Sequence, residues 1–320
     1  MNAIGYYNSY PVAFVYPHLR IALEYGMSIA TLSQLNMKYE RIGYGEPLLM
    51  IMGIGAQLIH WPPSFCQSLQ DEGFSLILPD NRDAGLTSQM SHLGKPNIPK
   101  IWGKAFLGLP AKAPYTLLDM AQDFIDLLDH LKISRCHLLG ISMGSMISQI
   151  LASQYPSRFQ SITLLHSNSG KKRHIIGANQ QAYQTLIYKK PIRNEQEYAD
   201  YIVKLLRALG SPGLLASEND MRIFAKVAYN RGYHPEGFLR QLAAVLATSN
   251  REPFYSTIRQ PTAIIHGAKD PLFPIINAQY LHQRIPNSSL HIFDDLGHDI
   301  PEKYHQPIAK IIRDLANQAP

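Results

Sequence analysis

The chain has 320 residues, 46% of them hydrophobic and 17% charged, a composition typical of a globular protein with a large core. Thirty lysines and arginines against 24 acidic residues give a formal net charge of +6. The densest basic clusters, 171–173 and 189–190, lie in no recognisable nucleic-acid-binding motif. We therefore expect no nucleic-acid partner, and at most a weak attraction of the basic surface to anionic substrates or membranes.

Residues 1–36 are fairly apolar, but a proline, a histidine and charged residues interrupt the apolar run before it reaches the roughly 18 residues of a membrane span. A basic segment followed by a cleavage site is also missing. We expect an N-terminal extension without an integral membrane segment, and a cytoplasmic protein. A short docked helix and translation that starts at Met27 or Met37 both remain open.

From residue 37 onward, short apolar runs alternate with amphipathic stretches, the pattern of a mostly parallel sheet with helices on both faces. The expected strands are "LNMKYERIG", 47–53, 74–80, 136–141, 161–166, 262–267 and 289–294. The expected helices are 64–72, 117–131, 142–155, 277–284 and 306–318, where apolar residues recur every three or four positions. Cys66 and Cys136 form no CxxC pair or disulfide framework, and we expect both in the core.

Two segments depart from this alternation. Residues 170–256 hold helical patterns but no strand-like run, which predicts a helical cap inserted between the strands at 161–166 and 262–267. Residues 88–115 are rich in Pro, Gly and Lys, and we expect a long loop there. The predicted organisation is a core of 37–169 and 257–320 that carries a cap of 170–256.

Gly140-Ile141-Ser142-Met143-Gly144 matches the G-x-S-x-G nucleophile elbow, in which a strand turns sharply into a helix with the serine at the apex. We expect Gly140 and Gly144 to pack so closely against their neighbours that side chains would clash there. The strand-like "CHLL" before the motif and the helical "SMISQILASQYP" after it make the match specific.

A nucleophilic serine needs a histidine base that is held by a carboxylate, in the chain order Ser, Asp or Glu, His. Asp270 follows the strand at 262–267, and His298 follows the last strand, so both should reach the sheet edge that carries Ser142. Asp294 and Asp295 are closer to His298 in sequence but end the last strand, in a poor position to face the ring. No His-x-x-x-His or carboxylate cluster suggests a metal site.

A tetrahedral intermediate also needs backbone N–H donors for its oxyanion, one after the nucleophile and one from a loop earlier in the sheet. Met143 supplies the first. Gly53 and Gly55 flank Ile54, whose N–H we expect to turn inward as the second. A plain tight turn is the alternative interpretation of these glycines. Trp61, shortly after this loop, is a candidate for lining an acyl pocket or for packing in the core.

The chain from about 38 to 318 resembles the α/β-hydrolase superfamily, and within it the bacterial serine esterases similar to aclacinomycin methylesterase. The resemblance rests on "LLMIMGIGAQLIHWP", "PDNRDAGLTS", "GISMGSMISQILASQYPSR", "HGAKDPLFP" and "LGHDIP". It implies an α/β-hydrolase fold with an eight-stranded, mostly parallel sheet, an inserted helical cap, a Ser-His-Asp triad and no cofactor. This chain has Met52-Gly53 where many members have His-Gly at the oxyanion loop, and "HSNSG" without a carboxylate after the strand at 161–166, where some members carry the acid.

These residues predict a serine hydrolase that cleaves a small to medium hydrophobic ester through an acyl-enzyme. Thioester cleavage, carbon–carbon bond hydrolysis and perhydrolysis by the same triad remain alternatives, as does a non-catalytic binding protein of the same fold. The sequence does not indicate an oligomeric state.

Overall fold

A computed structural model of the chain describes residues 28–175, 177–187 and 191–319. Eight strands form one sheet in the order β1-β2-β4-β3-β5-β6-β7-β8, and all pairs from β4 onward along this order are parallel, whereas β1–β2 and β2–β4 are antiparallel. The strands are β1 Ser28–Thr31, β2 Asn36–Ile42, β3 Glu46–Ile51, β4 Phe74–Pro79, β5 Cys136–Ile141, β6 Phe159–Leu165, β7 Thr262–Gly267 and β8 Ser288–Phe293. The predicted eight-stranded, mostly parallel sheet is confirmed.

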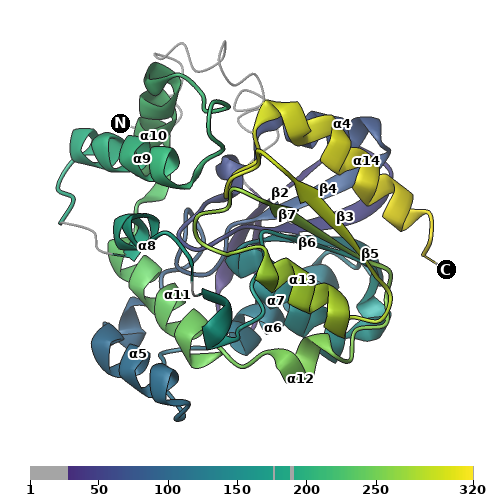
Figure 1. Cartoon of the computed structure of the whole chain (residues 1–320), viewed down its shortest axis with the longest axis horizontal. Helices are drawn as coiled ribbons and strands as arrows, with labels where there is room; N and C mark the ends of the chain where they lie inside the picture. Colours follow the sequence, from purple (N-terminus) through teal and green to yellow (C-terminus); the bar gives the residue numbers. More distant parts are fainter. Residues whose placement is uncertain (1–27, 176, 188–190, 320) are drawn as a thin grey trace.

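Helices cover both faces of the sheet, as the apolar periodicity predicts (Figure 1). On one face, α4 Pro63–Asp71 and α14 His305–Ala316 enclose a buried cluster around Phe65 and Ile312. On the other, α6 Leu117–His130, α7 Met143–Gln154 and α13 Ile276–Arg284 pack around Phe124 and Ile147. Cys66 and Cys136 are both free and buried, as expected.

Between β6 and β7, where the sequence predicts the cap, the described residues form five α-helices. They are α8 Gln180–Ile187, α9 Glu195–Leu209, α10 Glu218–Gly232, α11 Pro235–Ala247 and α12 Glu252–Tyr255. Figure 1 shows α8 to α11 gathered beside one edge of the sheet rather than over a face. The limits of 170–256 as a separate cap, and of the core on either side, stay a prediction. No helix among the described residues is long and apolar enough to cross a membrane.

The structure corrects two expectations. The sheet does not open at residue 37, because β1 lies inside the segment 1–36 that we expected to be an extension and pairs antiparallel with β2. The segment 88–115 is not one long loop. It contains the short 3₁₀ turn Ser91–Leu93 and helix α5, Ile98–Leu107, which packs beside α11 (Figure 1).

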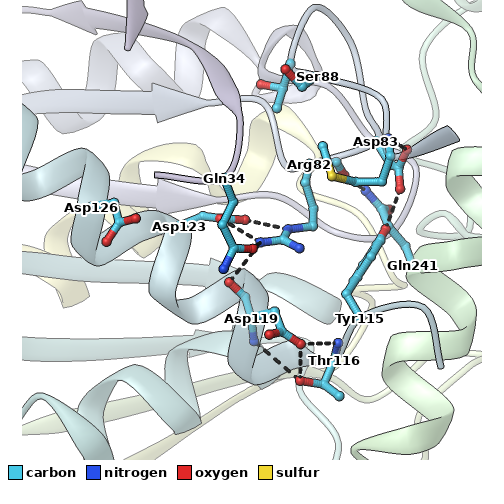
Figure 2. Close-up of polar contacts among 12 residues, drawn as sticks. Gln34, Arg82, Asp83, Ser88, Tyr115, Thr116, Asp119, Asp123, Asp126 and Gln241 are labelled. Carbon is cyan, nitrogen blue, oxygen red and sulfur yellow. Dashed lines mark hydrogen bonds and ion pairs between the residues drawn. The ribbon is translucent and has the colours of Figure 1, made fainter. Parts of the chain in front are cut away.

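The segment after β4 fastens the insertion to the sheet. Figure 2 shows Arg82 turned toward Asp123 on α6, while the next residue, Asp83, turns the other way, toward Tyr115. Arg82 donates two hydrogen bonds to the Asp123 carboxylate, at 2.6 and 2.7 Å, and the Tyr115 hydroxyl donates to Asp83 at 2.8 Å. Asp83 also receives two charge-assisted bonds from Arg240 on α11, at 2.7 and 2.8 Å. Asp83 has a φ of 66°, and this left-handed conformation at Asp83 accompanies the reversal of direction between the two side chains.

Candidate active site

Ser142 stands at the turn between β5 and α7 in a strained backbone conformation, with φ 55° and ψ −118°. Residues other than glycine rarely adopt a positive φ, and such backbone strain persists only where the surrounding structure fixes it. Here the Ser142 N–H donates to the carbonyl of Leu165 at the end of β6, at 3.0 Å. The serine is therefore held at the carboxyl edge of the sheet, as the elbow motif predicts.

The glycines of the motif lie where the chain leaves no space for a side chain. A Cβ atom on Gly144 would stand 2.0 Å from the carbonyl oxygen of Ile51, and one on Gly140 would stand 2.4 Å from the carbonyl oxygen of Gly144. Both distances are far below any real van der Waals contact, so the expected close packing at these two positions is confirmed. The tight approach brings α7 against β3 and fixes the direction of its first turn.

Asp270 and His298 meet at the same edge. The Nδ1 of His298 and the Oδ2 of Asp270 are 2.7 Å apart, and the Asp270 side chain is fully buried. The other carboxylate oxygen, Oδ1, accepts the N–H groups of Leu272 and Phe273 at 2.8 and 2.9 Å. Because one oxygen is fixed by the backbone and the other accepts from Nδ1–H, the Nε2 of His298 keeps the lone pair that a general base needs.

Two further histidines face Asp270. The Nδ1 of His166 lies 3.5 Å and the Nε2 of His266 lies 3.7 Å from Oδ2. Burial alone would raise the pKa of the Asp270 carboxyl, but the facing His298 and His166 rings outweigh burial and hold the pKa well below its usual range. Asp270 therefore carries its charge at neutral pH.

His266 and His166 differ in how they are held. Burial lowers the pKa of His266 to about 4, so this ring is neutral, and its Nε2–H donates to the carbonyl of Phe273 at 2.7 Å. His166, at the end of β6, has a positive φ of 49°, and its Nε2 donates to the carbonyl of Asp299 at 2.9 Å. Its ring centroid is 5.1 Å from that of His298. His166 therefore lies at the end of β6, between the strand that precedes Ser142 and the strand that precedes Asp270. The sequence alone does not reveal this position.

The loop that carries His298 is fastened to the end of α9. The His298 N–H donates to the carbonyl of Leu209 at 2.7 Å, and the Gly297 N–H donates to the Ser211 hydroxyl at 2.8 Å. The Ser211 N–H in turn donates to the Asp299 carboxylate. Asp295, the rejected candidate for the acid, pairs with Lys303 instead. Ser211 is a positioning residue that no sequence motif indicates.

The loop after β3 lies directly against the serine. A Cβ atom on Gly53 would be 3.7 Å from the Ser142 hydroxyl oxygen, and Gly55 has a φ of 68° with the Phe238 ring 2.8 Å from its Cβ position. The Gly55 N–H donates to the Gln241 side chain at 2.7 Å. Within the described part of the chain the Ile54 N–H has no acceptor, and Met143 is the first residue of α7, so its N–H has none within the helix. In the described structure, neither of the two predicted oxyanion donors therefore gives its N–H to an acceptor of the chain.

The serine and histidine are not joined directly. Among the described residues no hydrogen bond links the Ser142 hydroxyl to His298, although both residues are partly exposed and follow the carboxyl ends of parallel strands, β5 and β8, in the same sheet. Hydrogen bonds of this kind are often long in a free enzyme and shorten when substrate binds.

Trp61 is buried against Phe65 in the core beneath α4, so the packing interpretation of that residue is the one supported.

A cavity of about 470 Å³ lies within the inserted helices, between α8, α9 and α10, and neither Ser142 nor His298 lines it.

A metal site is the alternative use of the side chains around Asp270. His166, Asp270 and His298 bring one possible ligand atom each to within 4.8 Å of one another. A metal ion there would have to replace the proton between His298 Nδ1 and Asp270 Oδ2, and it would break the acid–base pair. His298 and Asp270 therefore fit a hydrogen-bonded acid–base pair better than a metal site.

Comparison with known proteins identifies the family of the chain. A family model described as the alpha/beta hydrolase fold matches residues 46–303. The chain is 24% identical over 284 residues to rhodomycin D methylesterase from Streptomyces peucetius, covering 83% of this chain and 89% of that protein. It is 26% identical over 289 residues to a poly(3-hydroxyalkanoate) depolymerase from Ectopseudomonas oleovorans, covering 85% and 84%.

Among solved structures, a meta-cleavage product hydrolase from Pseudomonas fluorescens superposes with a TM-score of 0.71 at 19% identity, covering 92% of this chain and 99% of that one. At this identity the superposition shows the fold alone. The family model covers most of the chain, and the matched range contains Ser142, Asp270 and His298. The chain is therefore a hydrolase of the α/β-hydrolase family.

Proposed function

We propose that this hydrolase cleaves carboxylic esters in two steps. Ser142 is the nucleophile and His298 the general base, while Asp270 orients the histidine ring and stabilises its protonated form. The observation that carries the proposal is the 2.7 Å contact between His298 and the buried Asp270, at the same carboxyl edge of the sheet as a serine held at φ 55°. The relatives named methylesterase and depolymerase support an ester as the substrate.

In the first step, His298 takes the proton of Ser142 while the serine oxygen attacks the ester carbonyl carbon. The N–H groups of Ile54 and Met143 stabilise the oxyanion, and each such donor contributes a factor of about 100 to 1000 in rate. The alcohol leaves with the proton from His298, and the acyl group stays on Ser142. Water, deprotonated by the same histidine, then attacks the acyl-enzyme, and the acid is released.

The substrate class that we propose is a small to medium hydrophobic ester. Two rings of the inserted helices lie near the proposed catalytic residues. Phe238 lies against Gly55 of the oxyanion loop, and the pKa of the half-buried Tyr183 is raised to about 12 by burial and, in addition, by the charge of Asp270. Apolar rings at this position favour apolar acyl or alcohol groups. A series of p-nitrophenyl esters of increasing acyl length, with lactones and thioesters of matched size, measures this preference.

The decisive experiment compares Ser142→Ala with Ser145→Ala. Both are the same chemical change within one helical turn of each other, but Ser142 is partly exposed at the start of α7, whereas Ser145 is fully buried inside the helix. Ser142→Ala should lower kcat on p-nitrophenyl acetate by about a million-fold and abolish labelling by a fluorophosphonate probe. Ser145→Ala should keep both. Hydrolysis and labelling that survive in Ser142→Ala would overturn the proposal, and an unlabelled wild-type chain would favour the non-catalytic alternative.

A further inference from the structure

The segment 84–118, which contains α5, concentrates exposed apolar side chains. Seven of the ten large hydrophobic side chains that are exposed in the described structure lie in it: Leu86, Leu93, Trp102, Phe106, Leu107, Leu109 and Leu118. Trp102 and Phe106 stack on each other, with ring centroids 5.3 Å apart, and are 56% and 59% exposed. A cluster of this kind on a monomer surface usually marks an interaction site.

The same segment is strongly basic. No Asp or Glu occurs between Asp83 and Asp119, while Lys95, Lys100, Lys104 and Lys112 are all exposed. In the described structure none of these four lysines forms an ion pair, whereas Lys171, Lys303 and Lys310 each pair with a carboxylate. The positive charge of the segment is therefore uncompensated by the protein itself.

The helical geometry places the lysines and the aromatic side chains at the two sides of one exposed arc of α5. At about 100° per residue, Trp102 and Phe106 fall on one side of the exposed arc of α5, and Lys100 and Lys104 lie about 160° from them, with Leu107 between the two rows. Ile101, on the opposite side, is buried. Lys172 adds a further cation on the aromatic side, since its Nζ reaches the carbonyl of Phe106 and lies 5.5 Å from the ring centroid. The basic cluster at 171–173 therefore borders α5.

We propose that this surface, the exposed arc of α5 with Leu109 and the bordering lysines, docks the enzyme on an anionic lipid bilayer. Aromatic and leucine side chains flanked by lysines are the composition of helices that lie in a membrane interface. The lysines complement the negative lipid headgroups, and the apolar arc enters the acyl boundary. Aliphatic Leu107 and Leu109 favour lipid over a nucleic acid, because leucine offers phosphate and bases neither charge nor a stacking plane. The docking surface adds an interaction to the proposed ester hydrolysis and does not depend on it.

The chain has two tryptophans, and this makes the test selective. Trp61 is buried, so only Trp102 can change its surroundings when the surface meets a membrane. The full chain is titrated with vesicles of phosphatidylcholine alone and with vesicles that contain 30% phosphatidylglycerol, as a chosen composition of about one third anionic lipid. We expect a blue shift of tryptophan fluorescence, together with co-sedimentation, only with the anionic vesicles, and release at high salt.

Variants separate the two contributions. Lys100→Gln/Lys104→Gln should weaken the partition constant about 25-fold, on the order of fivefold for each lysine, and Trp102→Ser/Phe106→Ser should weaken it at least about tenfold. Lys303→Gln/Lys310→Gln, with the same change in net charge at the far side of the molecule near α14, should bind like wild type (Figure 1). Circular dichroism confirms that each variant is folded.

Three results would overturn the proposal. The first is a wild-type chain that binds neither vesicle at low salt. The second is binding that the α5 variants and the Lys303/Lys310 variant weaken equally, which would mean a diffuse charge effect. The third is a dimer in light scattering that Trp102→Ser/Phe106→Ser dissociates while vesicle binding is absent, which would assign the surface to a second copy of the chain. Ester hydrolysis in the α5 variants should equal that of wild type, so the outcome is independent of the catalytic proposal.

Discussion

The buried pair between Asp83 and Arg240 should be among the strongest single links between the inserted helices and the sheet. Its two bonds are 2.7 and 2.8 Å long, and the two side chains are 0% and 1% exposed. Arg240→Met keeps most of the volume but leaves the Asp83 carboxylate in the interior without a counter-charge. Removing one partner of such a pair costs about 3–5 kcal/mol, more than the value of the pair itself, because the remaining charge is desolvated and uncompensated.

The structure provides a matched control in Arg207, which pairs with Glu218 at 2.6 Å while the two side chains are 58% and 43% exposed. Arg207→Met should cost less than about 1 kcal/mol, since water screens an exposed pair. The free energy of unfolding is measured by urea denaturation at pH 7. Asp83→Asn/Arg240→Met removes the orphaned charge and should recover part of the loss. Equal effects of the two arginine variants, or no recovery in the double variant, would refute the reasoning.

Three further outcomes follow from the site. Asp270→Asn should lower kcat about 10⁴-fold in a folded protein, while Asp295→Asn, whose carboxylate pairs with Lys303 and not with His298, should keep wild-type turnover on p-nitrophenyl acetate. Gly144→Ala, with its Cβ 2.0 Å from a backbone carbonyl, should cost about 1–3 kcal/mol of unfolding free energy and displace the elbow, whereas Gly103→Ala, which meets open space in α5, should not destabilise the chain. Burial lowers the pKa of His266 to about 4 in the folded chain, against 6.5 in the unfolded chain. Between these two pH values the unfolded state binds one more proton than the folded state. The free energy of unfolding should therefore fall by about 3 kcal/mol as the pH drops from 6.5 to 4. His266→Gln should flatten that decline, and an unchanged slope would contradict the assignment.

The sequence predicts the sheet and its helices well because their signals are local. Each parallel strand is a short apolar run and each covering helix has a clear apolar periodicity, so the predicted helices at 64–72 and 277–284 differ from α4 and α13 by one residue at most. The carboxyl ends of parallel strands share one edge, so the approach of Asp270 to His298 also follows from the order of strands. Both conclusions need only pattern and topology.

The features that the sequence does not predict depend on tertiary contact. β1 is four residues long, and the turn Leu32–Leu35 that joins it to β2 contains no glycine or proline to mark it. Helix α5 has a proline in its first turn and Gly103 inside it, which weakens its helical signal, and it exists because Ile101 packs toward the inserted helices beside α11. The position of His166 beside Asp270 requires β6 and β7 to be neighbours, which the chain order alone leaves undetermined.

The inserted helices do more than cover the edge, because they hold both halves of the site. The end of α9 fixes the His298 loop through Leu209 and Ser211, and Gln241 on α11 holds the oxyanion loop through Gly55 and also donates to the carbonyl of Arg82 at 2.7 Å. A displacement of α9 would shift the base, whereas a displacement of α11 would shift the oxyanion donor. The two positions act on different groups of the proposed mechanism, the base and the oxyanion donor, so Ser211→Ala should alter the pH dependence of kcat, while Gln241→Ala should lower kcat without moving that dependence. This separation distinguishes helices that position catalytic groups from helices that only enclose substrate.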